Sequence, residues 1–304
     1  MESEVKHLLI ENGKILGVQM LDDEKHFGKY VVAAPGRSGS EWLKTESQLL
    51  GLKTFNNPVD IGLRVEVRAK VMEELTDSLY DPKLVYYSQQ FEDKLRTFCV
   101  APYGEVITES YGDGILTVNG QSYAERKTNN TNFAILVSTE FTYPFREPID
   151  YGRYLAKLTN ILSGGVMIQR LGDLTAGRRS TDERISRGVV TPSLSNATPG
   201  DLSFILPYRY MVSINDMLHA LNKLAPGVYS RDTLLYGLEV KFYSCRLELG
   251  PSFESKIKNL FTIGDGAGVT RGLVQSSVSG VMAAREIIRQ ETNQKVSDET
   301  KNHE

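Results

Sequence analysis

A chain of 304 residues has room for about two domains, and a hydrophobic content of 40% is sufficient for a sizeable core. The 35 Lys and Arg residues nearly balance the 38 Asp and Glu residues, which gives a formal net charge of -3 at pH 7. No overall basic field therefore favours nucleic acid or anionic lipid as a partner.

The two cysteines, Cys99 and Cys245, stand far apart without a CxxC pair, and the four histidines are scattered. This composition provides neither a disulfide framework nor a zinc site, so we expect buried free cysteines, a cytoplasmic location and no bound metal. No apolar run approaches the roughly 18 to 20 residues of a spanning helix, so no membrane span is expected.

The amino-terminal segment predicts an antiparallel meander that leads into a buried strand. The Asn-Gly pair at 12–13 lies between two alternating apolar runs, which is the strongest short-range hairpin signal. A second turn at 22–23 precedes an apolar run over 30–34. The glycine loop around Gly36 ends this strand, and a helix containing Trp42 is predicted to begin near residue 40.

From about Phe55 the pattern changes to long alternating runs: VDIGLRVEVRAKV, LVYYSQQF, KLRTFCVAP, GEVITES and GILTVNG. Turns are predicted at 102–104, 112–114 and 119–120. These features favour a mostly antiparallel sheet with one solvated or ligand-facing side.

Helices dominate the second half of the chain. After a further strand, TNFAILVSTEF, helical spacing covers 149–162 and 214–224, and the stretch 180–195 between them is irregular. A final strand, glycine loop and helix begin near Lys258. We expect that helix to bury one stripe, formed by Val274, Val278, Val281 and Ile288.

The stretch GDGAG at 264–268 carries the clearest chemical signal. Asp265, at the carboxyl end of the strand, is placed to accept hydrogen bonds from sugar-like hydroxyls, while Gly264 and Gly266 admit a ligand beside the helix N-terminus. The alternative is an Asp-Gly turn that caps a helix. A second glycine loop, AAPGRSG, favours a nucleotide cofactor, because its strand is expected to lie in the same sheet.

A family resemblance extends over about 5–290. It is carried by the segments VVAAPGRSGSEWL, RTFCVAPYGEVI, VNGQSYAER, IQRLGDLTAGRRS, PGDLSFILP, LLYGLEVKFYSCRLE and LFTIGDGAGVTRGLVQSSVSG. These segments resemble the bacterial and archaeal FAD-dependent dehydrogenases sometimes labelled NAD-utilizing dehydrogenases, which are related more distantly to glutathione-reductase-type flavoproteins. The resemblance implies FAD as cofactor, with NAD(P)H as a candidate electron donor.

The implied fold is α/β, with a partial FAD/NAD(P)-binding Rossmann-like domain and an inserted β-rich (α+β) substrate domain. The expected boundaries are 1–50 with 245–290 for the FAD-binding domain, 51–244 for the insert and 291–304 for a flexible tail. The sequence contains no GxGxxG motif, which the family uses for the ADP pyrophosphate. It therefore resembles the carboxyl-terminal portion of a longer flavoprotein, and a chain that supplies the missing amino-terminal half is a candidate partner.

Site residues follow from the resemblance. Gly264, Asp265 and Gly266 would hold the ribityl and pyrophosphate region, although the family often has Glu at the position of Asp265. The pyrimidine edge of the flavin would be approached by 268–273, which includes Gly268, Arg271, Gly272 and Leu273. Gly36 and Arg37 would flank the cofactor from the other strand. The alternative for Arg271 is a solvent-exposed arginine.

The substrate side is much less specific. Glu239, Lys241 and Arg246 alternate with apolar residues, which an amphipathic strand also does. The arginines of the segments GRRS (177–180) and PYRY (207–210) could bind an acidic substrate or NAD(P)H phosphates, or belong to solvated loops. No catalytic acid-base pair can be assigned.

The sequence thus predicts an FAD-dependent oxidoreductase that transfers hydride to or from an unidentified small molecule. One alternative is a non-catalytic fragment that acts as a binding or assembly module and needs a partner chain. Another is a flavin-independent enzyme that uses the glycine loops for a different nucleotide.

Overall fold

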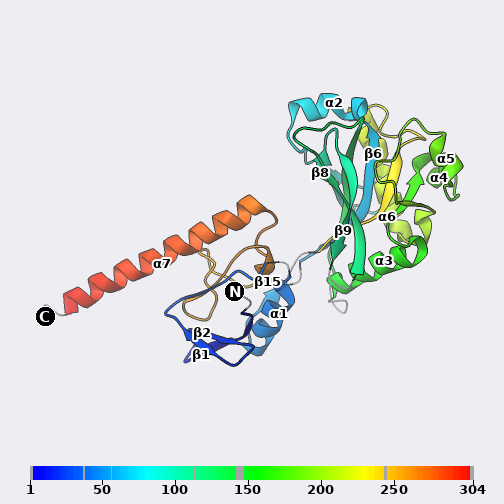
Figure 1. Cartoon of the computed structure of the whole chain (residues 1–304). Coiled ribbons are helices and arrows are strands. Elements are labelled where there is room, and N and C mark those ends of the chain that lie inside the picture. The colour runs from blue at the N-terminus through cyan, green and yellow to red at the C-terminus, as the bar shows by residue number, and fades with distance from the viewer. Residues whose placement is uncertain are drawn as a thin grey trace. The chain divides into compact units, whose positions relative to one another are not determined.

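The chain divides into two compact units, which are called unit 1 and unit 2 below (Figure 1). A computed structural model describes residues 3–36, 38–55, 57–111, 114–141, 147–242 and 245–301. Unit 1 combines two distant segments, Met1–Asn57 and Tyr243–Glu304, whereas unit 2 is the continuous segment Pro58–Phe242. Among the described helices, none has both the length and the apolar character needed to cross a bilayer.

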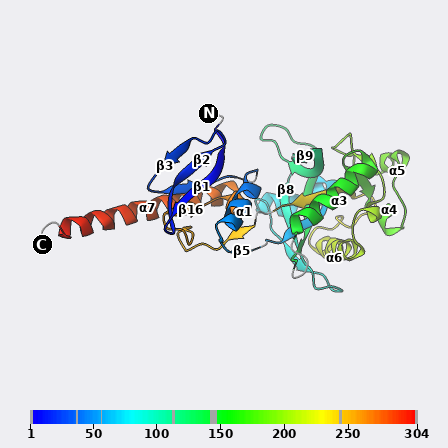
Figure 2. The ribbon, with the colours of Figure 1, turned by 90° about the horizontal axis from the view of Figure 1, so that it is seen from below.

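Unit 1 begins with a three-stranded meander formed by β1 (Val5–Glu11), β2 (Lys14–Met20) and β3 (Lys25–Phe27) (Figure 2). The predicted hairpin at 12–13 is confirmed, because β1 and β2 pair antiparallel with Glu11 opposite Lys14. The sequence did not predict β3, whose three residues are all exposed and show no apolar periodicity.

The two glycine loops follow strands that pair with each other. β4 (Val31–Ala33) and β16 (Leu260–Thr262) are parallel, although more than 200 residues separate them in sequence. Both loops therefore lie at the carboxyl edge of the same pair, as the sequence predicts. The parallel pair is two strands wide in the described part of the chain, so a Rossmann-like sheet stays a prediction.

The remaining elements of unit 1 are short, except for its last helix. These elements are α1 (Ser40–Leu49), β5 (Thr54–Phe55), β15 (Arg246–Leu247), η3 (Asp265–Ala267) and α7 (Leu273–Lys301). β5 pairs with β15, and α1 contains Trp42 as predicted. Helix α7 continues past residue 291, where the sequence predicted that a flexible tail begins.

The predicted burial of the α7 stripe is wrong. Val274, Val278, Val281 and Ile288 are all exposed, and Val274 exposes 77% of its surface. Small residues on another side of the helix pack against the rest of unit 1 instead. Ser279 and Ala283 are buried, and the Gly264 amide donates to Ser279 Oγ at 3.2 Å. A serine and an alanine let the helix approach the β16 loop more closely than valines would.

Unit 2 is built on a seven-stranded sheet. Its order is β13-β12-β14-β6-β11-β8-β7, antiparallel except for the β12–β13 pair. The strands are β6 (Val59–Arg68), β7 (Val85–Tyr87), β8 (Lys94–Ala101), β11 (Asn130–Thr139), β12 (Met167–Arg170), β13 (Thr198–Pro199) and β14 (Leu234–Lys241). The predicted mostly antiparallel sheet is thus present.

Apolar side chains of alternate residues form the core on one face of this sheet. On β6 these residues are Val59, Ile61, Leu63, Val65 and Val67. The helices α2 (Ala69–Ser78), α3 (Pro148–Ser163) and α6 (Tyr208–Leu224) add side chains to this core. Shorter helices complete the unit: α4 (Leu171–Thr175), α5 (Asp182–Ser186) and η2 (Leu202–Phe204).

The opposite face of the sheet is covered rather than solvated. The hairpin of β9 (Glu105–Tyr111) and β10 (Ile115–Gln121) contacts β14 and β8 on this side (Figure 1). Asp60, Arg64 and Glu66 of β6 consequently have no exposed surface, although they alternate with apolar residues. The prediction of a solvated or ligand-facing side is corrected, because a second layer of strands closes over it.

One predicted turn lies inside a strand. Asn119 and Gly120 belong to β10 and pair with Ile107 and Val106. A Cβ at position 120 would overlap the Arg64 guanidinium, so the glycine makes room for a buried side chain instead of a turn. The turn at 102–104 is confirmed between β8 and β9, whereas Gly112 and Asp113 of the turn predicted at 112–114 lie outside the described residues.

Candidate functional site

The loop that follows β16 contains two glycines with left-handed backbone on either side of a short 3₁₀ turn. Gly264 and Gly268 have φ angles of 76° and 69°, which glycine adopts without steric cost. Between them, Asp265–Ala267 forms a single turn of 3₁₀ helix. The sequence of small residues therefore matches the local conformation of the loop.

The two glycine loops meet at Gly36 and Gly266. A Cβ on Gly266 would overlap the carbonyl oxygen of Gly36, so this approach requires glycine at position 266. Around this contact the backbone is open, because a Cβ at Gly36, Gly264 or Gly272 would have no atom within 4 Å. Arg37, the remaining predicted residue of the first loop, lies outside the described residues.

Asp265 is held by two hydroxyl groups that follow it in the sequence. Its Oδ1 accepts hydrogen bonds from Thr270 Oγ1 at 2.5 Å and from Ser276 Oγ at 3.0 Å. These contacts match the alternative interpretation, an aspartate that orders the turn before a helix. Within the described residues Oδ2 has no hydrogen-bond partner, so this carboxylate retains one oxygen that can accept from a ligand.

The predicted flavin-edge residues surround the start of α7. Leu273 is the first residue of the helix and exposes 89% of its surface, and Gly272 precedes it. Arg271 is exposed and lies before the helix rather than in its first turn, and its amide donates to Gln275 Oε1 at 2.9 Å. The Gly268 carbonyl accepts a hydrogen bond from Asn57 Nδ2 at 3.1 Å.

The structure separates the three predicted substrate residues. Glu239 and Lys241 belong to β14 of unit 2 and are buried, with Glu239 fully so. Arg246 belongs to β15 of unit 1, where its guanidinium lies 5.4 Å from the centre of the Phe55 ring. Burial of all eight β14 residues replaces the amphipathic strand that the sequence suggests.

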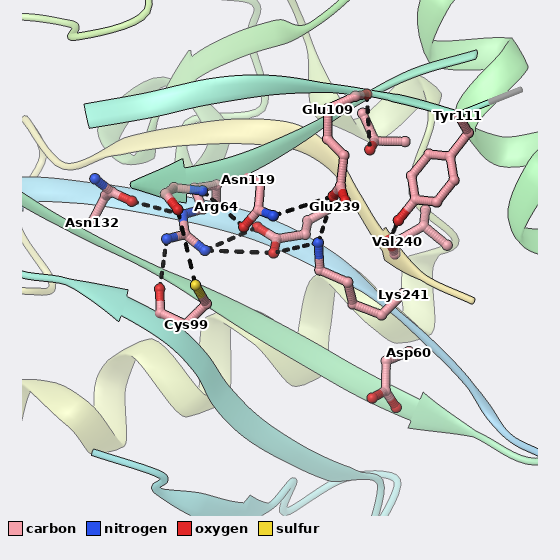
Figure 3. Close-up of polar contacts among 12 residues, drawn as sticks. Asp60, Arg64, Cys99, Glu109, Tyr111, Asn119, Asn132, Glu239, Val240 and Lys241 are labelled. Carbon is pink, nitrogen blue, oxygen red and sulfur yellow. Dashed lines mark hydrogen bonds and ion pairs between the residues drawn. The ribbon is translucent and has the colours of Figure 1, made fainter. Parts of the chain in front are cut away.

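Glu239 takes part in a network beneath the β9–β10 hairpin, shown in Figure 3. Arg64 Nη1 lies 3.4 Å from a Glu239 carboxylate oxygen, Nε donates to Asn132 Oδ1 at 2.8 Å, and Nη2 donates to the Cys99 carbonyl at 2.6 Å. Arg64 and Glu239 are both fully buried, and a buried charge without a partner is costly. Each of the two side chains therefore compensates the charge of the other.

Lys241 extends this network toward the hairpin. Its Nζ lies 2.8 Å from Glu109 Oε2 and 3.5 Å from Glu239 Oε1 (Figure 3). Burial opposes the charged ammonium, but the charge of Glu239 and the charge and hydrogen bond of Glu109 outweigh it, so the pKa of Lys241 lies above its ordinary value. Lys241 is therefore a fixed cation and is not poised to act as a base.

Another buried carboxylate, that of Glu66, lies on the same face of β6 as Arg64. Glu66 accepts hydrogen bonds from Tyr236 Oη at 2.5 Å, from Asn130 Nδ2 at 3.0 Å and from the Ser193 amide at 3.3 Å. Burial, followed by the charge of Glu66, raises the pKa of Tyr236 well above its ordinary value. Tyr236 therefore stays a neutral donor to this carboxylate.

Sequence reasoning did not select Arg64, Glu66 or Glu109. The signal was present in VDIGLRVEVR, where Asp, Arg and Glu alternate with aliphatic residues. It shows which residues share a face, but not that the hairpin, 40 to 60 residues further along, covers that face.

Comparisons with known proteins agree with a flavin-related assignment. The family described as "FAD-dependent protein, C-terminal domain-like" matches residues 58–242, which are unit 2. An uncharacterized protein of Clostridium beijerinckii is 28% identical over 219 residues, which cover 68% of this chain and 40% of that protein. This chain thus aligns with well under half of its relative's length.

Solved structures give weaker likenesses. The FAD complex of glycerol-3-phosphate dehydrogenase from Bacillus halodurans has a TM-score of 0.27 and 13% identity, covering 96% of this chain and 39% of that chain. P. aeruginosa PqsL in complex with 2-aminobenzoylacetate has a TM-score of 0.28 and 11% identity, covering 93% and 49%. Scores this low do not establish a common fold. The family match, which spans more than half of the chain, shows that the chain belongs to the FAD-dependent proteins with this C-terminal-domain-like unit.

Proposed function

We propose that the chain is part of an FAD-dependent oxidoreductase whose flavin is approached by the two glycine loops of unit 1. The observation that carries this proposal is the contact of Gly36 with Gly266 at the carboxyl edge of the parallel β4–β16 pair. Ligands of open α/β sheets bind at this edge. Family membership supplies the identity of the ligand.

The residues of unit 1 fit the ribityl and flavin portion of FAD. Open backbone at Gly36, Gly264 and Gly272 leaves space that a Cβ would occupy, and Asp265 Oδ2 is available to a hydroxyl group. The first amides of α7 carry the positive end of the helix dipole, which would stabilise negative charge on a reduced ring. When bound, FAD supplies the ability to accept or donate a hydride.

We further propose that the chain belongs to the NAD-utilizing group of these dehydrogenases, with NAD(P)H as the candidate electron donor. In this scheme Glu239 pairs with Arg64 and with Lys241, and these residues serve the architecture of unit 2 rather than substrate binding.

FAD binding tests the proposal through Asp265. Quenching of FAD fluorescence by the purified chain should be measurable but weak, because the sequence contains no GxGxxG loop for the pyrophosphate. Asp265→Asn should weaken binding by about 10- to 100-fold, as expected for loss of a charged hydrogen-bond acceptor worth about 1.5–3 kcal/mol. Asp22→Asn, in the exposed β2–β3 turn, is the matched control and should bind FAD like the parent. Equal affinities of all three proteins would contradict the proposal.

A binding or assembly module is the second candidate. The observation that favours it is the exposed apolar face of α7, which includes Leu273, Val274, Val278, Val281 and Met282. Contiguous apolar surface of this kind marks interaction sites. Sedimentation velocity combined with the FAD fluorescence titration distinguishes the two functions. An assembly module should self-associate or require a partner, and it should not quench FAD fluorescence.

A further inference from the structure

Unit 2 contains a pocket of about 320 Å³ that is lined mainly by arginines. The arginines are Arg170, Arg178, Arg184, Arg187 and Arg231, and the acidic lining residues are Asp173 and Asp232. Five positive and two negative groups leave the lining with a formal charge of +3. All of these lining residues belong to unit 2, whereas the residues that we assign to flavin belong to unit 1.

Local structure brings these residues together from distant parts of the sequence. Arg170 ends β12 opposite Leu234 of β14, so the turn that precedes β14 lies beside it. Backbone hydrogen bonds fix this junction, because the Gly172 amide donates to the Arg231 carbonyl at 3.0 Å. After α4, the side chain of Thr181 caps α5, which carries Arg184.

The two aspartates are already paired with two of the arginines. Asp232 Oδ1 lies 3.0 Å from Arg170 Nη2, and Asp173 Oδ1 lies 3.0 Å from Arg178 Nε. Burial raises the pKa of Asp173, but hydrogen bonds from Ser180 and Arg178 and the nearby arginine charges outweigh it, so the net shift is downward. The Asp173–Arg178 pair is therefore charged at neutral pH. Each aspartate is counted against one guanidinium.

The other arginines have no close ion pair among the described residues, although the charge of Arg187 acts on the nearby Glu183 carboxylate. Within the described part of the chain, no ion pair joins Arg184, Arg187 or Arg231 to an acidic side chain. In addition, Arg170 exposes only 5% of its surface, and its buried Nε has no hydrogen-bond partner. A buried donor without an acceptor is costly in a folded protein, so the charge of Arg170 is only partly compensated beside this pocket.

We propose that this pocket binds the phosphate group of a small molecule. A phosphate dianion offers three acceptor oxygens to the planar forks of several guanidinium groups, and it matches the excess positive charge better than a single carboxylate does. The site is independent of the flavin proposal. Its phosphate could come from free phosphate, a sugar phosphate or the 2′-phosphate of NADP, which share this chemistry.

Calorimetric titration with inorganic phosphate near pH 8 and at low ionic strength tests the site, because added salt screens such contacts. The variant is the double substitution Arg187→Gln with Arg231→Gln, since both arginines are exposed and their loss should leave the fold intact. The matched control is Arg179→Gln with Arg68→Gln, which removes the same charge from two exposed arginines outside the pocket. Circular dichroism verifies that both proteins are folded.

Phosphate should bind the parent and the control within about twofold of each other, whereas the double variant should bind at least about tenfold more weakly. Titrations with ribose 5-phosphate, and with NADP⁺ against NAD⁺, identify the source of the phosphate. Pocket-dependent binding of ribose 5-phosphate, or of NADP⁺ in preference to NAD⁺, supports the site. Absence of phosphate binding by the parent, equal weakening in the control, or selective binding of succinate would overturn it.

Discussion

In unit 2 the ionisable side chains of β6 and β14 lie beneath a hairpin and bind one another, whereas in unit 1 the glycine loops after β4 and β16 leave backbone open around Gly36 and Gly264. The first arrangement pairs its buried charges internally, although Asn130 Oδ1 and Asn132 Nδ2 are buried without a hydrogen-bond partner in the described part of the chain. The second has small residues, an available carboxylate oxygen and a helix terminus. Buried charge thus supports the architecture of unit 2, whereas the candidate cofactor site is marked by two glycine loops that meet at the edge of a parallel strand pair.

The largest expected effect comes from breaking the buried ion pair of unit 2. Arg64→Met should lower the free energy of unfolding by about 3–5 kcal/mol, because Glu239 loses its principal partner in a fully buried setting. Arg68→Met, at the exposed end of the same strand, should change it by no more than about 0.5 kcal/mol. Urea denaturation measures both. Similar midpoints for the two variants would show that the network adds no stability to unit 2.

The next effect tests the close contact of the loops in unit 1. Gly266→Ala should destabilise unit 1 by about 1–3 kcal/mol, since the added Cβ would overlap the Gly36 carbonyl. Gly272→Ala meets no atom within 4 Å and should be tolerated. Differential scanning calorimetry separates these outcomes. Equal stability of the two variants would mean that the loops do not approach each other in solution.

A smaller effect is expected from the hydroxyl that orders Asp265. Thr270→Val keeps the shape of the side chain but removes the donor to Asp265 Oδ1, and should cost about 1 kcal/mol because Ser276 still donates. Thr292→Val makes the same change on the exposed surface of α7, where only a backbone carbonyl is contacted. Thermal unfolding should rank Thr270→Val below Thr292→Val. A lower unfolding temperature for Thr292→Val than for Thr270→Val would show that the Thr270–Asp265 hydrogen bond does not order the turn.

The smallest effect concerns an ion pair on α7. A hydrogen bond from Arg289 lowers the pKa of Glu286 to about 2 from an ordinary value of 4.5. A lowered carboxyl pKa favours the folded state above pH 4.5, and this contribution disappears as the pH falls from 4.5 toward 2. Arg289→Gln should return the pKa toward its ordinary value in an NMR titration, whereas Arg285→Gln should not.

The sequence predicted the elements of unit 1 that local signals define. The hairpin at 12–13, the helix with Trp42 and the strands before both glycine loops are present, because turn residues and short apolar runs specify them. Their parallel pairing was also expected, from the argument that two glycine loops serve one ligand. The α7 stripe was misjudged because helical periodicity identifies a face, not what covers it.

Long-range packing explains the errors in unit 2. Helix α2 begins at Ala69, inside the run VDIGLRVEVRAKV, whose alternation predicts a strand. Asn119-Gly120 lies within β10 instead of a turn. Gly120 is explained by the Arg64 side chain, which comes from a strand more than 50 residues earlier. The network of Arg64, Glu239 and Glu109 likewise depends on two strands of the large sheet and one of the hairpin, which meet only in the folded unit.

The pairing of β6 with β14 has a consequence for how such a chain can be recombined. These strands are the first and last of unit 2, and Asp60 lies directly opposite Lys241. Opposite residues of an antiparallel pair are about 4.5–5.5 Å apart, so the chain enters and leaves unit 2 at nearly one point. A gene segment encoding 58–242 can therefore be exchanged between related proteins through two adjacent junctions, without rerouting the polypeptide on either side.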